Sequence, residues 1–282
     1  MRLRDTVVER CLRLTAFSSV LALLSITLFI FKEGAPFIYR VGLGNFLSTS
    51  WHPTSSAHQY GIAYMIVGSA AVTAGALSFG VPLGIACAVV LGEMSSDSTR
   101  SLLKPAIEIL AGIPSVVFGF IGIAVVLPWI RSSLGGPGAS GLAGALILGV
   151  MILPTIIAIS LDALRNVPRS YREASLATGA TEWQTIWHVV LPAARSGIVA
   201  AVVLGVGRAV GETMAVVMVT GNAVQLPHSP LAPLRTLTAN LALEMAYATD
   251  DHRAALFATG VVLFVVVVLL NSVAGLARRK AR

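Results

Sequence analysis

The sequence predicts an all-α, polytopic membrane protein with six transmembrane helices. Its mean hydropathy is +0.83, 56% of its residues are hydrophobic and only 12% are charged. Several apolar runs exceed the roughly 18 residues that indicate a membrane-spanning helix. At about 1.5 Å per residue, such a run crosses about 30 Å of hydrocarbon. The predicted spans lie near residues 14–31, 62–91, 106–130, 141–161, 197–221 and 254–277.

The distribution of positive charge predicts the orientation of these spans, because Lys and Arg are preferentially retained on the cytoplasmic side. With the N-terminus inside, fourteen of the 20 Lys and Arg residues fall in cytoplasmic segments and five fall outside. Both termini are therefore expected in the cytoplasm. The formal charge of +7 indicates contact with anionic membrane lipid and no nucleic-acid partner, since the basic residues flank spans without interleaved aromatic residues.

Composition divides the chain into three parts. Residues 1–61 contain an N-terminal anchor helix and an outer segment, in which Trp51 is expected to lie at the membrane interface. Residues 62–277 contain the other five spans and a cytosolic loop at about 165–195, and residues 278–282 form a basic cytosolic tail. The two cysteines lie at separate spans, so we expect neither a disulfide nor a metal site.

Two spans contain Gly and Pro where an uninterrupted helix would be weakened. Gly80-Val81-Pro82 lies in the second span, and residues 111–115 (AGIPS) lie in the third. A proline has no N–H and frees a carbonyl that a neighbour must satisfy, so such a break either lines a pathway or forms a packing kink. We favour packing for the first break. The second makes Ser115 a candidate for a pathway.

Polar residues interrupt the fifth span at residues 205–213 (GVGRAVGET). An Arg at the bilayer centre costs roughly 2.5–3.5 kcal/mol on insertion scales, so Arg208 should face protein, water or a counter-ion. Glu212 lies four residues later and is expected to reach it. Gly207 and Gly211 have the spacing that lets another helix approach closely. The residues alone leave two alternatives open, an Arg–Glu pair that locks helices together and a polar station for an ion or solute.

The loop between the fourth and fifth spans is predicted to form an elbow of two short helices. Ser170, with Glu173 three residues later, is expected to cap the first helix, and Gly179 to stop it. A second helix should start at Thr181 and run through Leu191-Pro192 into the fifth span. Such an elbow suits docking on another protein, and a plain amphipathic surface helix is the alternative.

The spacing within this loop resembles the EAA loop of binding-protein-dependent ABC importer permeases. Their pattern is Glu-Ala-Ala, three residues, Gly, nine residues and Ile-x-Leu-Pro. The chain reads Glu173-Ala174-Ser175, three residues, Gly179, nine residues and Val189-Val190-Leu191-Pro192, with departures at Ser175 and Val189. The resemblance covers about residues 62–277 and implies a type I ABC importer permease fold. It also implies that the loop docks on a cytosolic ATPase through Glu173, Ala174, Ser175, Gly179, Leu191 and Pro192.

The chain lacks the Gly-x-x-x-x-Gly-Lys-[Ser/Thr] phosphate loop that binds ATP. We therefore expect a non-catalytic subunit without a cofactor or metal of its own, and ATP bound by the partner ATPase.

Two further segments resemble the high-affinity phosphate importer permeases, closer to the PstC type than to the PstA type. They are residues 110–120 (LAGIPSVVFGF) and 207–216 (GRAVGETMAV). The resemblance implies a heterodimer with a PstA-type permease, two cytosolic ATPase subunits and an extracytoplasmic phosphate-binding protein in a bacterial or archaeal cell (inner) membrane. It also implies a path for inorganic phosphate, for which the candidate residues are Arg208, Glu212, Thr213 and Ser115.

On this resemblance the chain is expected to be the permease subunit of an ATP-driven phosphate importer. Arg208 would attract the anion, while Glu212 would orient Arg208 or accept a hydrogen bond from protonated phosphate. One alternative is a permease for another oxyanion, such as sulfate or molybdate, in the same family. The other is an ion-coupled anion transporter, which needs no ATPase docking element, so the elbow counts against it.

Overall fold

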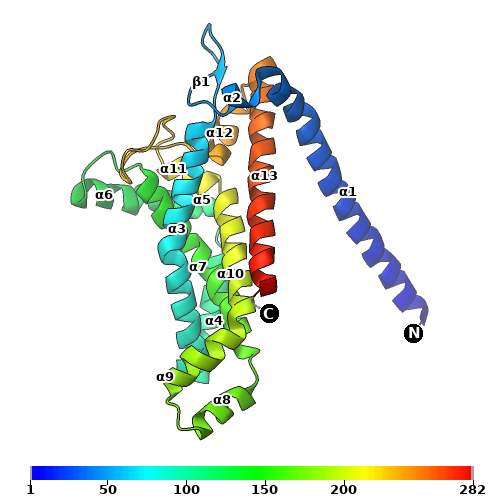
Figure 1. The fold of residues 1–282 in the computed structure, drawn as a ribbon, viewed down its shortest axis with the longest axis vertical. Coiled ribbons are helices and arrows are strands. Elements are labelled where there is room, and N and C mark those ends of the chain that lie inside the picture. The colour runs from blue at the N-terminus through cyan, green and yellow to red at the C-terminus, as the bar shows by residue number, and fades with distance from the viewer. Residues whose placement is uncertain (1, 281–282) are drawn as a thin grey trace. The chain divides into compact units, whose positions relative to one another are not determined.

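The computed structural model describes residues 2–280 and is mostly helical (Figure 1). Within this range six helices are long and apolar enough to cross a membrane, which confirms the predicted number. They are Val8–Val41, Ala63–Met94, Ser115–Ser133, Gly141–Arg165, Glu182–Gly211 and Asp250–Ser272. The chain folds into two compact units.

The first unit takes in the chain up to Ile62 together with Glu244–Phe264. Its elements are α1 (Arg2–Val41), α2 (Leu43–Phe46), β1 (Trp51–His52), β2 (Gln59–Tyr60) and the first part of α13 (Asp250–Lys280). Helix α1 packs on α13 where the rings of Phe29 and Phe257 meet edge to face, with centroids 5.4 Å apart. Apolar side chains on the preceding turns of α1 are exposed, for example Phe17 at 68%, which is typical of a surface that faces lipid.

The outer segment of this unit forms a small buried core, so the expectation that Trp51 anchors at the membrane interface is wrong. Strands β1 and β2 pair antiparallel, with Trp51 opposite Tyr60. Trp51 is 4% exposed, and its Nε1 donates to Glu244 Oε2 at 3.0 Å. Nε2 of His252 lies 2.8 Å from the same oxygen. A buried partner for the indole N–H removes the reason for that ring to sit at the interface.

The second unit comprises Ala63–Leu243 and the chain from Val265 onward. Its helices are α3 (Ala63–Val89), α4 (Asp97–Gly112), α5 (Ser115–Ile121), α6 (Leu127–Ser133), α7 (Gly141–Arg165), α8 (Arg169–Ala177), α9 (Glu182–Thr185), α10 (Leu191–Gly211), α11 (Met214–Val219) and, at its end, α12 (Leu237–Glu244). Three π-helical turns extend or join these helices: η1 (Val90–Met94), η2 (Gly122–Val126) and η3 (Ile186–Val190).

Helix α7 is the most buried of the spans, and both α3 and α10 pack on it. Small residues allow the close approach: Gly149 lies against the ring of Phe79, and Gly80 lies against Ile152 and the carbonyl of Gly149. Helix α3 continues through Pro82. The break at Gly80-Val81-Pro82 is therefore a packing contact, as favoured from the sequence.

The backbone breaks within two of the predicted spans. The span predicted at 106–130 is interrupted at Ile113 and Pro114, where α4 ends in extended backbone and α5 begins. Proline cannot continue the hydrogen bonding of α4, and it disfavours helical backbone at the residue before it. The span predicted at 197–221 ends at Gly211, and α11 follows after Glu212 and Thr213.

Candidate functional site

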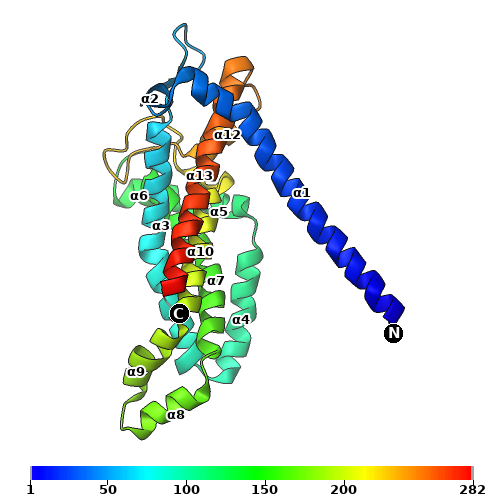
Figure 2. The same ribbon diagram turned by 45° about the vertical axis from the view of Figure 1, so that its right-hand side comes forward.

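The segment 165–195, hereafter the elbow, folds into two helical arms at one end of the second unit (Figures 1 and 2). The first arm, α8, begins directly after Pro168, and no side chain caps it. The predicted capping box of Ser170 and Glu173 is therefore wrong, because Ser170 already lies inside the helix. Gly179 ends the arm in left-handed backbone, with φ of 88°, as predicted.

The second arm begins where the sequence predicts. Thr181 caps α9: its hydroxyl accepts from the Gln184 N–H at 3.3 Å, and the Gln184 side chain accepts from the Thr181 N–H at 2.9 Å. From Glu182 the helix runs without interruption to Gly211. The π-helical turn η3 lies directly before Leu191-Pro192, where an α-helix would bring the proline ring against a carbonyl of the preceding turn. The second arm is thus a rigid extension of the fifth span.

The two arms are tied together, and their outer surface is exposed. Ser175 Oγ lies 2.8 Å from Thr185 Oγ1, whose residue is 3% exposed. The rings of Trp183 and Trp187 stack with centroids 6.1 Å apart and remain 59% and 58% exposed. Of the predicted coupling residues, Glu173, Ala174, Gly179 and Pro192 are exposed, and Ser175 and Leu191 are half-buried. Exposed apolar rings beside a rigid helix are typical of a protein interface.

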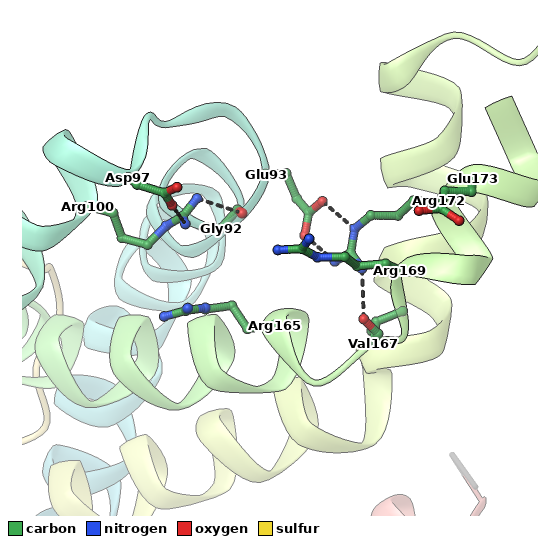
Figure 3. Close-up of a pocket in the computed structure, with 9 residues that line it drawn as sticks. All are labelled: Gly92, Glu93, Asp97, Arg100, Arg165, Val167, Arg169, Arg172 and Glu173. Atoms are coloured by element: carbon green, nitrogen blue, oxygen red, sulfur yellow. Dashed lines mark hydrogen bonds and ion pairs between the residues drawn. The ribbon is translucent and has the colours of Figure 1, made fainter.

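An ion pair absent from the sequence-based prediction anchors the first arm (Figure 3). Arg172 Nε donates to Glu93 Oε2 at 2.9 Å and its Nη2 donates to Glu93 Oε1 at 2.6 Å, so the contact is bidentate. The guanidinium also donates to the carbonyls of Val167 and Leu164. The hydrogen bond to Glu93 raises the pKa of Arg172 above its ordinary value. Two opposite charges 79 positions apart give no periodic signal from which the pairing could be predicted.

In the fifth span, the predicted contact between Glu212 and Arg208 is wrong. Helix α10 ends at Gly211 and Glu212 adopts extended backbone, so the i, i+4 geometry of a helix does not apply. Instead, Glu212 Oε1 accepts from the N–H groups of Thr213 at 3.0 Å and Ala215 at 3.2 Å. The carboxylate therefore caps α11. Arg208 is half-buried and has no hydrogen bond or ion pair to any residue whose side chain the structure describes, that is 8–272 and 275.

The face of α10 that carries Gly207 and Gly211 is open. A Cβ at either position would meet no atom of another segment within 4 Å in the described part of the chain. No helix in the described part of the chain therefore packs on these two small residues. Gly112, at the other backbone break, is open in the same way.

The two backbone breaks bring three of the predicted path residues to one end of a helix pair. Gly119 of α5 lies against Ala215 of α11, and Gly122 lies against Val219. The later glycine contacts the later residue of α11, so the two segments run parallel. Ser115 and the Glu212-Thr213 break therefore lie at the same end of the pair. Helix N-termini carry partial positive charge, which favours anions nearby. Arg208 lies one turn earlier, on α10.

A cavity of only about 10 Å³ lies beside this break, lined in part by Glu212, Thr73 and Thr238. The hydroxyl of Thr238 donates to the Glu212 carbonyl at 2.9 Å. The cavity has room for about one water molecule. A path for a phosphate ion through this cavity would require a different conformation. Among the residues whose side chains are described, no cluster of three or more His, Cys, Asp and Glu is placed to hold a metal ion.

Comparison with protein families identifies the chain. A model described as "Binding-protein-dependent transport system inner membrane component" matches residues 80–282. The chain belongs to this family. Its members are the membrane subunits of ABC importers and do not hydrolyse ATP themselves. The chain is accordingly a non-catalytic permease subunit, which works with another permease subunit, an ATPase and a substrate-binding protein.

Curated relatives match most of the chain. "Probable ABC transporter permease protein YqgH" of Bacillus subtilis is 44% identical over 256 residues, covering 89% of this chain and 83% of the relative. "Phosphate transport system permease protein PstC" of Mesorhizobium japonicum is 33% identical over 293 residues, covering 96% and 89%. PstC of Xylella fastidiosa is 33% identical over 288 residues, covering 94% and 88%.

Solved structures of ABC importers share the fold. One chain of a bacterial alginate ABC transporter superposes with a TM-score of 0.71 at 16% identity, covering 99% of this chain and 96% of that chain. A chain of the MetNI methionine transporter gives 0.61 at 22% identity, covering 76% and 93%. At this identity the likeness shows the fold, which is that of type I ABC importer permeases as predicted.

Glu93→Gln should loosen the first arm of the elbow. Glutamine keeps the shape of the side chain but loses the charge that strengthens the bidentate contact with Arg172. We expect the amides of α8 to exchange with deuterium about tenfold faster, which corresponds to about 1.4 kcal/mol. Asp97→Asn is the matched control, because the Asp97 side chain is 99% exposed and its partner Arg100 keeps its carbonyl acceptors. Equal exchange in the two variants would remove the anchoring role.

Substitutions of Gly179 should separate backbone strain from docking. A Cβ there meets no atom within 4 Å, so Val has space but must adopt left-handed backbone, at a cost of about 1–2 kcal/mol. Asn tolerates that backbone. We expect Gly179→Val to lower both co-purification of the ATPase and ATP-driven uptake by more than about tenfold, because such a cost shifts the elbow's equilibrium about that far. Gly179→Asn should retain most of both. Undiminished ATPase binding by the Val variant would contradict a coupling role for the elbow.

Proposed function

We propose that this chain is the transmembrane permease subunit of an ATP-driven phosphate importer. The observation that carries the proposal is the similarity to phosphate transport permeases over 96% of the chain at 33% identity. In this proposal a PstA-type permease completes the translocation path and two ATPase subunits bind ATP. An extracytoplasmic phosphate-binding protein delivers inorganic phosphate. The chain itself carries no cofactor.

The proposal places the chain in a bacterial or archaeal cell membrane with both termini in the cytoplasm. The excess of Lys and Arg in the segments assigned to that side supports this orientation. The elbow then faces the cytosol, where Glu173, Ala174 and Gly179 can contact the ATPase. Because the second arm continues into α10, a movement of the ATPase would be transmitted along the fifth span.

Arg208 is the proposed electrostatic element of the phosphate path. A guanidinium that lies within a span and has no partner among the described residues keeps its full positive potential for an anion. Thr213 and Ser115, at the start of α11 and α5, would supply hydroxyl groups, and the N-terminal end of α5 has a polarity that favours an anion. Glu212 would act indirectly, by capping α11 and holding the break open.

A reconstituted transporter tests the cargo. The chain should co-purify with an ATPase and a second permease, and proteoliposomes of this complex with its binding protein should accumulate radiolabelled phosphate only with ATP. Unlabelled phosphate should compete, whereas sulfate and molybdate should not, since neither of these dianions carries a proton to donate at neutral pH. Competition by sulfate would assign a different oxyanion. Uptake driven by an ion gradient without ATP would instead favour a secondary transporter.

Charge at position 208 should decide the transport rate. Arg208→Gln should lower uptake about 10²–10³-fold, as removal of one preorganised stabilising group typically does, while the complex still assembles. Arg208→Lys should retain partial activity, because it keeps the charge and loses the planar fork. Glu212→Gln is the matched control: its amide oxygen can still accept from Thr213 and Ala215, so uptake should remain near that of the wild type. Uptake at the wild-type rate by Arg208→Gln would exclude Arg208 from the path.

A further inference from the structure

A polar pocket of about 470 Å³ opens at the base of the elbow, away from the proposed phosphate path (Figure 3). Its walls come from four elements: the π-helical turn η1, the start of α4, the end of α7 and the start of α8. Four arginines line it, namely Arg100, Arg165, Arg169 and Arg172. One coupling residue, Glu173, also lines the pocket, but none of the four arginines is among the coupling or path residues.

Two of these arginines hold the walls in place. Arg172 is engaged by Glu93 and two carbonyls, as described above. Arg100 donates to Asp97 at 2.8 Å and to the carbonyls of Leu91, at 2.6 Å, and Gly92, at 3.1 Å. Their side chains are only 22% and 16% exposed. The walls are therefore preorganised by hydrogen bonds that require no ligand.

The other two arginines are open to solvent. Arg165, near the end of α7, and Arg169, the first residue of α8, are exposed. Neither has a hydrogen bond or ion pair to any residue whose side chain the structure describes (8–272 and 275). Among the carboxylates of the lining, only Glu173 likewise has no ion pair within the described residues. The groups without an ion pair are then two arginines and one carboxylate, and their net charge is positive. Figure 3 shows Arg165 extending from α7 below the gap between the Arg100 and Arg172 walls.

The start of α8 reinforces the positive potential. This nine-residue helix has no side-chain cap and no acidic residue in its first turn. Its first N–H groups and the guanidinium of Arg169 therefore lie at the same end. Guanidinium groups bind phosphate oxygens in a planar, bidentate manner, and the pocket has room for a phosphate group with several waters.

We propose that this pocket binds a phosphate group, held by Arg165 and Arg169. Free inorganic phosphate and the headgroup of an anionic phospholipid share this chemistry. A group bound by both arginines would bridge the connection Asn166–Pro168 and so fix the angle between α7 and the first arm of the elbow. The proposal does not depend on which anion the transporter carries.

Hydrogen–deuterium exchange of the complete transporter in nanodiscs of phosphatidylcholine tests the site with local resolution. Replacing chloride by about 10 mM phosphate at equal ionic strength should slow exchange in peptides covering 165–173, by about tenfold where the ligand exceeds its Kd tenfold. A second arm compares phosphatidylglycerol with phosphatidylcholine without added phosphate. Because exchange is measured in peptides covering 165–173, binding in this pocket is distinguished from phosphate binding in the transport path and at the nucleotide sites.

Three paired variants complete the test. Arg165→Gln with Arg169→Gln should abolish the slowing, whereas Arg165→Lys with Arg169→Lys should keep part of it. Arg10→Gln with Arg13→Gln removes two exposed arginines of α1 and should leave the slowing unchanged. Slowing by free phosphate, or only by phosphatidylglycerol, supports the proposal and names the source. The proposal is overturned if neither ligand slows exchange, or if the glutamine pair responds as the wild type does. It is also overturned if these amides are already protected in chloride and do not respond, because a partner subunit then fills the pocket.

Discussion

The bidentate contact between Arg172 and Glu93 is the constraint on which the elbow depends. Through it, the first arm is fixed to the turn that follows α3, while carbonyls at the end of α7 hold the same guanidinium. The second arm is continuous with α10. Because α3 and α10 both pack on α7, the two arms are attached to the helices that form the core of the second unit. A force on the elbow therefore reaches packed helices rather than a flexible linker.

The sequence predicted those features that depend on local chemistry. Six apolar runs were enough to count the spans, and Gly179 and Thr181 marked the end of one arm and the start of the next, because left-handed backbone and helix capping each require particular residue types. The features it missed depend on tertiary geometry. An i, i+4 relation between Arg208 and Glu212 holds only if the helix continues, and nothing in the periodicity shows that α10 stops at Gly211. Trp51 was misplaced for the same reason, since its buried partner Glu244 lies 193 positions away.

The open face of α10 follows from the chain being one part of an assembly. A guanidinium inside a span without a partner is costly unless protein, water or a ligand satisfies it. Gly207 and Gly211 flank Arg208 with a surface that no helix of the described chain covers. A second permease subunit packed near this face would leave a narrow space beside the charge. The glycine face without a packed helix and the arginine without a partner thus both indicate that the second permease subunit packs on this part of α10.

The capping role of Glu212 explains how a carboxylate and a guanidinium can lie so close in sequence without cancelling. Had α10 continued, Glu212 would lie one turn beyond Arg208, and an ion pair would neutralise the charge that an anion needs. The break turns the carboxylate toward the N–H groups of Thr213 and Ala215, so its negative charge is balanced by the end of α11. Arg208 is left with its positive potential intact. The backbone break is therefore the feature that directs Glu212 to the backbone of α11 and leaves only the Arg208 side chain available to a passing anion.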